Sequence, residues 1–180
     1  MDEIRTIREG DLEAILGMNA AAVQQTSHLD RGELQSLVRM ADYGRVMTVD
    51  GEVAAFLIAL REGAPYESAN YQWFAARFPR FLYVDRIVVG ARFRKRGIGS
   101  RMYRDLFEFA RGQAVGMIAC EYNLVPPNPA SRAFHDSFGF RECGTQWVVD
   151  GTKQVSLQSA DTRQGPAANR PAAPGPADDG

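Results

Sequence analysis

The chain has 180 residues, 45% of them hydrophobic and 24% charged, with a formal net charge of -1. This length and composition predict one globular domain with a core of both helices and strands. A near-neutral chain lacks the wide basic face that non-specific nucleic-acid binding needs. A phosphate ligand would therefore have to be held by a local cluster of cations.

Export, membrane insertion and metal binding are not expected. The acidic and polar start over 1–5 is unlike a secretory signal. Every apolar run is interrupted by charge or glycine before the roughly 20 residues that would cross a bilayer. Cys120 and Cys143 are too few for a disulfide scaffold and lack metal-ligand spacing. We expect a soluble cytoplasmic protein with both cysteines in its core.

The first 60 residues predict two helices and three strands. Residues 4–9 alternate as in a strand, and Asp11 suits the start of a helix carrying Leu12, Ile15 and Leu16 on one face. His28 lies in the connector to a second amphipathic helix over 34–41 and is expected to be a solvated loop residue. Asp50-Gly51 accepts the positive φ of a tight turn, so 46–49 and 53–60 predict a hairpin.

An aromatic connector over 61–79 precedes the next strand, which is expected over 80–89. It is too long and too aromatic for a simple turn, which is typical of a binding element or a lid. The aromatic side chains either line an acceptor pocket, cover the sheet or form a contact in a homodimer. They are Tyr66, Tyr71, Trp73, Phe74 and Phe78.

The remaining sequence predicts two more helices, a buried strand and a hairpin. Ile98, Met102, Leu106 and Phe109 recur at helical spacing, and the helix is expected to end at 111–112. A buried strand is expected over 115–122. The last elements are a helix opened by the N-cap of Asn128-Pro129 and closed by Gly139, and a hairpin of 140–149 and 153–157 around Asp150-Gly151.

From Gln158 onward the chain is mostly Ala, Pro, Gly and Asp, with almost no large apolar residue. Such a segment cannot offset its ordering entropy by burial. We therefore expect a folded domain over 1–157 and a disordered tail over 158–180.

The run Arg94-Lys95-Arg96-Gly97-Ile98-Gly99 lies between a predicted strand and a helix expected to begin near Ser100. Glycines let backbone amides turn toward one point, and a helix N-terminus adds partial positive charge that attracts a pyrophosphate. Arg92 and the cations of the run supplement this charge. The alternative is a solvated basic turn. Neither a Rossmann nor a Walker phosphate loop is present.

A strand followed by R-x-x-G-x-G and a helix resembles the acyl-CoA pyrophosphate site of the GNAT acetyltransferases. A second run, N-P-A-S-R-A-F-H-D-S-F-G-F over 128–140, resembles the family's N-x-x-A-x-x-x-Y-x-x-x-G-F helix. It departs from that pattern twice, with Ser131 for the common alanine and His135 for the usual tyrosine. The resemblance covers about 4–157, and the runs over 83–89 and 120–123 also resemble a bacterial subgroup whose acceptor is unassigned.

The resemblance implies an α/β (α+β) fold with a mixed, mostly antiparallel sheet of about seven strands and about four flanking helices. Strands 4 and 5, here 82–89 and 115–122, would splay apart around the pantetheine arm. Acetyl-CoA is the implied co-substrate, with no metal, and an acceptor amine would attack the thioester directly. The implied cofactor-binding residues are Ile87, Val88, Val89, Arg94, Lys95, Arg96, Gly97, Ile98, Gly99, Ser100, Asn128 and Ser131.

Three residues are candidates for proton transfer. Glu121 resembles the family's strand-borne glutamate and is expected to act as the base, directly or through water; the alternative is an ion pair with an arginine. Two extra residues around Pro126-Pro127 separate Glu121 from Asn128, compared with the simplest pattern of the family. Asp85 is the competing base, or else an ion-pair partner of Arg86. His135 is expected to protonate the leaving thiolate, or else to be a surface histidine.

The acceptor stays open. A small-molecule amine is favoured over a protein N-terminus or lysine, because the aromatic connector is suited to enclose a compact substrate. The alternative from a different class is a non-catalytic acyl-CoA sensor, against which Glu121 and His135 argue together.

Overall fold

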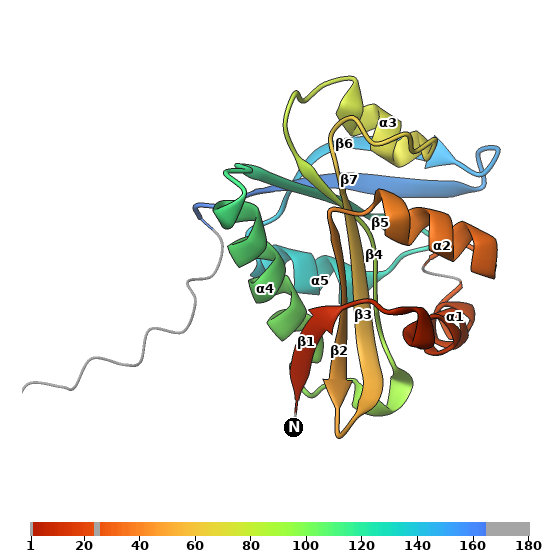
Figure 1. Cartoon of the computed structure of the whole chain (residues 1–180). Coiled ribbons are helices and arrows are strands. Elements are labelled where there is room, and N and C mark those ends of the chain that lie inside the picture. Colours follow the sequence, from red (N-terminus) through yellow and green to blue (C-terminus); the bar gives the residue numbers. More distant parts are fainter. Residues whose placement is uncertain (1, 24–25, 165–180) are drawn as a thin grey trace, which may run out of the picture.

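A computed structural model describes residues 2–23 and 26–164, which form a seven-stranded sheet flanked by helices (Figure 1). The strand order is β1-β2-β3-β4-β5-β7-β6, and only the β4–β5 pair is parallel. The strands are β1 Glu3–Thr6, β2 Tyr43–Val49, β3 Glu52–Arg61, β4 Leu82–Val89, β5 Met117–Val125, β6 Arg141–Val148 and β7 Lys153–Asp161. The helices are α1 Leu12–Ala21, α2 Arg31–Met40, α3 Ala69–Ala75, α4 Ile98–Gly112 and α5 Pro129–Ser137, with 3-10 turns at Glu9–Asp11 and Ala91–Phe93.

Strand β3 is buried on both faces and divides the core in two. Phe56, Ile58 and Leu60 pack with α1, α2 and α3, whereas Leu57 and Ala59 pack with α4. Side chains alternate across a strand, so a continuous apolar run supplies both faces of a covered sheet. This arrangement confirms the expected fold class. Within the described residues, no helix is both long and apolar enough to cross a membrane.

The predicted aromatic loop over 61–79 contains a helix, α3, which is the fifth where about four were expected. Tyr71 and Phe74 lie about one turn apart and are 1% and 0% exposed, so this short helix is fixed by burial against the sheet. Trp73 contacts β6 so closely that a Cβ added at Gly144 would lie 2.6 Å from its ring. These rings therefore cover the sheet, one of the alternatives left open by the sequence.

Strand β7 runs past the domain boundary expected at Leu157. It continues to Asp161, opposite Met117 of β5, and buries Gln158 and Ala160. Pairing with β5 orders this stretch although its sequence is poor in large apolar residues. The rest of the predicted tail, from residue 165, lies outside the described residues.

The two cysteines differ in environment. Cys120 is buried on the central strand β5, as expected, but Cys143 is exposed. The register of β6 with β7 shifts between Glu142 and Gly144, so Cys143 is the extra residue of a bulge on an edge strand. The expectation that both thiols lie in the core is wrong for Cys143.

Strands β4 and β5 part soon after they meet. Their described pairs are Leu82 with Ile118 and Tyr83 with Ala119. Just beyond, the register of β4 against β3 shifts so that Asp85 is an extra residue. A bulge bends its strand and increases the local twist, which accounts for the divergence. This confirms the expected splay of strands 4 and 5.

Candidate active site

A cavity of about 850 Å³ opens where β4 and β5 diverge. One end is formed by the turn before α4, and the other by the α1–α2 connector, the start of α3 and the β6–β7 hairpin. Every residue predicted to act in catalysis or cofactor binding, except Arg96, lines it. Those lining residues are Asp85, Ile87, Val88, Val89, Arg94, Lys95, Gly97, Ile98, Gly99, Ser100, Glu121, Asn128, Ser131 and His135.

The turn before α4 has the backbone geometry of an anion site. Gly97 is the N-cap with φ 72°, and Lys95 also has a positive φ, 60°. A helix of 15 residues follows from Ile98, slightly earlier than expected, and its N-terminus carries partial positive charge. A Cβ added at Gly99 would lie 3.5 Å from the Phe134 ring, which is an ordinary contact distance, so α4 and α5 pack against each other beside the cavity at this position.

The four predicted cations of this turn separate into two groups. Arg94 and Lys95 line the cavity. Arg92 instead forms an ion pair with Glu52, and the Arg96 guanidinium lies 5.6 Å from the Phe93 ring centre. Two of the four cations of this turn therefore line the cavity, and the predicted phosphate contact of Arg96 stays a prediction.

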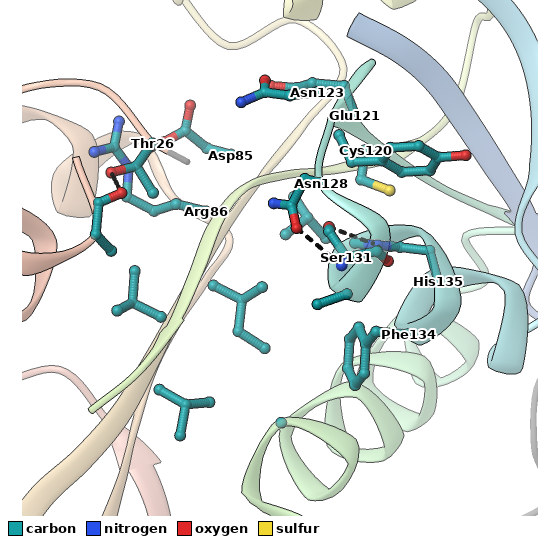
Figure 2. Close-up of a pocket in the computed structure, with 18 of the residues that line it drawn as sticks. Thr26, Asp85, Arg86, Cys120, Glu121, Asn123, Asn128, Ser131, Phe134 and His135 are labelled. Atoms are coloured by element: carbon teal, nitrogen blue, oxygen red, sulfur yellow. Dashed lines mark hydrogen bonds and ion pairs between the residues drawn. The ribbon is translucent and has the colours of Figure 1, made fainter. Parts of the chain in front are cut away.

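Helix α5 begins as the sequence indicated. The Asn128 Oδ1 accepts a hydrogen bond of 3.1 Å from the Ser131 backbone N–H, and Pro129 occupies the first turn (Figure 2). This cap fixes both residues at the cavity wall on the β5 side.

Glu121 lies in the cavity wall on β5 and is held by neutral donors. The Tyr83 hydroxyl donates a hydrogen bond of 2.8 Å to its Oε2. Asn70 also hydrogen-bonds it, while the Asn70 Oδ1 accepts from Gln146 Nε2 at 3.1 Å, which leaves the Asn70 amide hydrogens for the carboxylate. Burial raises the pKa of Glu121 to about 7 against these donors. No ion pair between Glu121 and an arginine occurs among the described residues.

Asp85 is engaged in a separate buried network. Its Oδ2 accepts from Arg86 Nε at 2.6 Å, and its Oδ1 accepts from the Tyr66 hydroxyl. Arg86 also donates to Asn19 Oδ1 at 2.9 Å, and the Asp85 and Arg86 side chains are each only 5% exposed. Figure 2 shows both beside Thr26, across the cavity from Ser131 and His135. The ion-pair alternative therefore describes Asp85, and we do not carry it forward as the base.

His135 is buried, at 4% exposure, rather than on an open helix face. Its Nδ1 lies 2.7 Å from the Ser131 carbonyl oxygen, which can only accept, so Nδ1 carries the proton. Its Nε2 then accepts from the Tyr103 hydroxyl at 2.8 Å. Burial lowers the pKa of His135, which favours this neutral form. The predicted surface alternative is therefore wrong, and no N–H of the ring is directed at the cavity to protonate a thiolate.

Sequence reasoning missed the residues that hold Glu121. Tyr83 was seen only as part of a strand, and Asn70 and Gln146 meet through a helix that was not predicted. His28 is exposed in its connector, as expected. Within residues 2–23 and 26–164, no group of three or more metal-ligating side chains occurs.

Comparison with known proteins identifies the family. The model of the Acetyltransferase (GNAT) family matches residues 9–140. The chain belongs to the GNAT family. This GNAT protein has no significant sequence match among curated proteins.

Solved structures share its fold at low sequence identity. The ribosomal-protein-S18-alanine N-acetyltransferase of Escherichia coli has a TM-score of 0.65 and 17% identity, covering 90% of this chain and 94% of the other. A ribosomal-protein-alanine N-acetyltransferase of Brucella melitensis gives 0.64 and 24%, covering 88% and 99%. Arabidopsis thaliana Naa50 with the bisubstrate analogue CoA-Ac-MVNAL gives 0.67 and 13%, covering 89% and 98%.

Proposed function

We propose that this GNAT protein transfers an acetyl group from acetyl-CoA to a primary amine, by direct attack of the amine on the thioester in a ternary complex. The observation that carries the proposal is a carboxyl group of pKa about 7, that of Glu121, in a cavity that begins at an anion-attracting helix N-terminus. A general base works best when its pKa lies near the working pH.

The cofactor would lie along the gap between β4 and β5. The turn over 94–99 would hold the pyrophosphate through the first backbone amides of α4 and the charges of Arg94 and Lys95. Beyond Tyr83 the described β4–β5 pairing stops, so the edge of β4 is available to hydrogen-bond pantetheine. A backbone amide near Val89 would stabilise the oxyanion that forms as the thioester carbonyl is attacked.

The acceptor must lose a proton before or during the attack. An alkyl amine of pKa about 10.4 costs roughly 4.6 kcal/mol to deprotonate at pH 7, whereas an α-amine near 7.8 costs about 1 kcal/mol. Glu121 would take this proton, directly or through water. This first proton then passes from Glu121 to solvent. As the C–N bond forms, the amine nitrogen releases a second proton, which Glu121 takes, and as the C–S bond breaks the thiolate needs one proton. A thiol of pKa about 8.5 binds it more tightly than a carboxyl of pKa about 7, so protonated Glu121 can return it.

A small-molecule amine remains the favoured acceptor, in the cytoplasm where the sequence predicts the protein to work. The aromatic connector contributes Tyr66, Ser68 and Asn70 to the lining of the cavity that also contains Glu121. This enclosure supports a compact acceptor. A protein N-terminus or lysine is the second candidate, because two structural neighbours are ribosomal-protein-alanine N-acetyltransferases. An acyl-CoA sensor without turnover is the third.

A thiol-release assay with acetyl-CoA tests the proposal. Small amines, peptides with a free N-terminus and peptides with only a lysine amine are compared, each at pH 8. Amine-dependent release of CoA together with a mass gain of one acetyl group on the amine is expected. Tight CoA binding without turnover of any amine would instead identify a sensor and overturn the proposal.

A further inference from the structure

At the end of the cavity away from the turn before α4, where the acceptor would bind, the wall is formed by the neighbouring strands β5, β7 and β6. Glu121 of β5 lies opposite Leu157 of β7, and Asn123 lies opposite Val155. Lys153, two residues before Val155 on the same strand, lies opposite Val148 of β6. Residues at alternate positions of a strand, and residues directly opposite each other, share a face. Lys153 therefore lies on the same face as Glu121, and it lines the same cavity.

The Lys153 ammonium is an unpaired cation at this end. It makes no hydrogen bond or ion pair with the described part of the chain. The Asp85 carboxylate, also in the cavity wall, is already paired with Arg86, and Arg94 and Lys95 lie at the other end. Two valines on the same wall also line the cavity. They are Val148, directly opposite Lys153 on β6, and Val155, two residues further along β7.

A half-buried cation without a partner among the described residues, in a cavity that would admit a substrate, favours a ligand with a negative group. Resting on the proposed function, we propose that the acceptor is an amine that also carries a carboxylate. Its amino group would lie at Glu121 and its carboxylate at Lys153.

The spacing selects the length of this acceptor. Lys153 is four residues from the position opposite Glu121, which is about 13 Å along the strand at about 3.3 Å per residue. The long, flexible lysine side chain can cover part of this span, but the one carbon that separates the amine and carboxylate of an α-amino acid does not bridge the rest. A straight-chain ω-amino acid has the required reach, and its methylene groups would contact the valines.

The test compares 6-aminohexanoate with 6-aminohexanamide, which has the same length and amine but no charge. The wild-type protein is expected to have a kcat/KM about tenfold higher for the acid, the effect of one charge-assisted hydrogen bond. This preference should shrink at high salt, because Lys153 is partly exposed to solvent. Equal values for the two amines would overturn the inference.

Two variants and a control assign the effect to one residue. Lys153→Met should lower kcat/KM for the acid about tenfold and leave the amide unchanged, and Lys153→Glu should make the amide the better substrate. Arg104→Met removes a positive charge from an exposed site on α4 outside the cavity and should preserve the preference. A preference for the acid that survives Lys153→Met would refute the role of Lys153.

The two proposals fail differently. If other amines are acetylated and the acid has no advantage over its amide, acetyl transfer stands and the carboxylate-bearing acceptor is rejected. If no amine is acetylated while CoA still binds, the proposed function fails, and the inference with it.

Discussion

The Tyr83 hydroxyl donates a hydrogen bond of 2.8 Å to Oε2 of Glu121 and so links β4 to β5 at the point where their pairing ends. This donor and Asn70 favour the carboxylate, while burial favours the protonated form and is the larger effect. The resulting pKa of about 7 is what a base for amine deprotonation needs at neutral pH. The divergence of the strands thus opens the gap proposed to bind the cofactor and places a carboxyl group of raised pKa beside it.

Replacing Glu121 by glutamine removes the base and nearly preserves its shape. We predict that kcat/KM falls about 10²- to 10⁴-fold. In the wild-type protein, kcat/KM should rise with pH through an apparent pKa of about 7, because the ionised carboxylate is the active form. With a peptide α-amine as acceptor, the kcat/KM of the variant should depend on pH only through ionisation of that amine, whose pKa is about 7.8. An unchanged profile in the variant would remove Glu121 from the mechanism.

Tyr83→Phe removes only the hydroxyl that stabilises the charged carboxylate. The pKa of Glu121 should rise, and the acidic limb of the kcat/KM profile should move to higher pH. Tyr71→Phe is the matched control, since Tyr71 lies in the same aromatic cluster with its ring centre 5.6 Å from that of Tyr83, but its hydroxyl bonds backbone groups of 61–64. The control should lose stability without shifting the profile; a shift of equal size in both variants would rule out a specific role for Tyr83.

The raised pKa of Glu121 also predicts a pH-dependent effect on stability. Between its ordinary value of 4.5 and about 7, the native state binds more protons at this site than the unfolded state. This site therefore destabilises the wild-type protein increasingly as pH rises through that window. Glu121→Gln should raise the free energy of unfolding by up to about 3 kcal/mol at pH 8 and have little effect at pH 4. Urea denaturation at both pH values measures this, and a gain of equal size at pH 4 would contradict the raised pKa.

The Tyr103–His135 hydrogen bond is expected to be structural. His135→Phe leaves the Tyr103 hydroxyl buried without its partner and should cost about 1–3 kcal/mol beyond any packing change. Adding Tyr103→Phe removes that unsatisfied hydroxyl. The double variant should therefore lose less free energy of unfolding than the two single variants lose when their losses are added. Turnover per folded molecule should stay near the wild-type value. A loss of about 10²-fold or more in folded His135→Phe would instead restore the histidine as the acid.

Gly97→Glu tests the anion site at the N-terminus of α4. A carboxylate at this N-cap opposes the pyrophosphate, so the Kd for acetyl-CoA should rise at least about a hundredfold, or about 2.8 kcal/mol. Gly51→Glu is a matched control because Gly51 also has a positive φ, 83°, and an added Cβ would meet no atom within 4 Å. Gly51 lies in the β2–β3 turn outside the cavity. Comparable affinity in the two variants would reject the assignment of the turn.

Much of this fold was predictable because its signals are local. Alternation and helical spacing placed β3 and α4, Asp50-Gly51 marked a hairpin turn, and Asn128-Pro129 marked a helix start that its cap bond confirms. Helix α3 was missed because its seven residues are stabilised by the burial of Tyr71 and Phe74 rather than by any helix pattern. The end of β7 was missed because pairing with β5, not composition, orders it.

The site was predictable in position but less so in chemistry. The glycine turn and Glu121 were identified by residue type and place along the chain, and both line the cavity. Spacing did not reveal that α5 turns His135 into the core against Tyr103, or that Asp85 is already held by Arg86. Those outcomes depend on contacts between distant segments, which periodicity within one element does not encode.

Calorimetric titration of the folded protein with CoA is the most direct test of the claim that the gap between β4 and β5 binds this cofactor. One CoA should bind per chain, with heat that disappears in Gly97→Glu and persists in Gly51→Glu. The absence of binding heat and of thermal stabilisation by CoA or acetyl-CoA, in protein shown to be folded, would contradict the account.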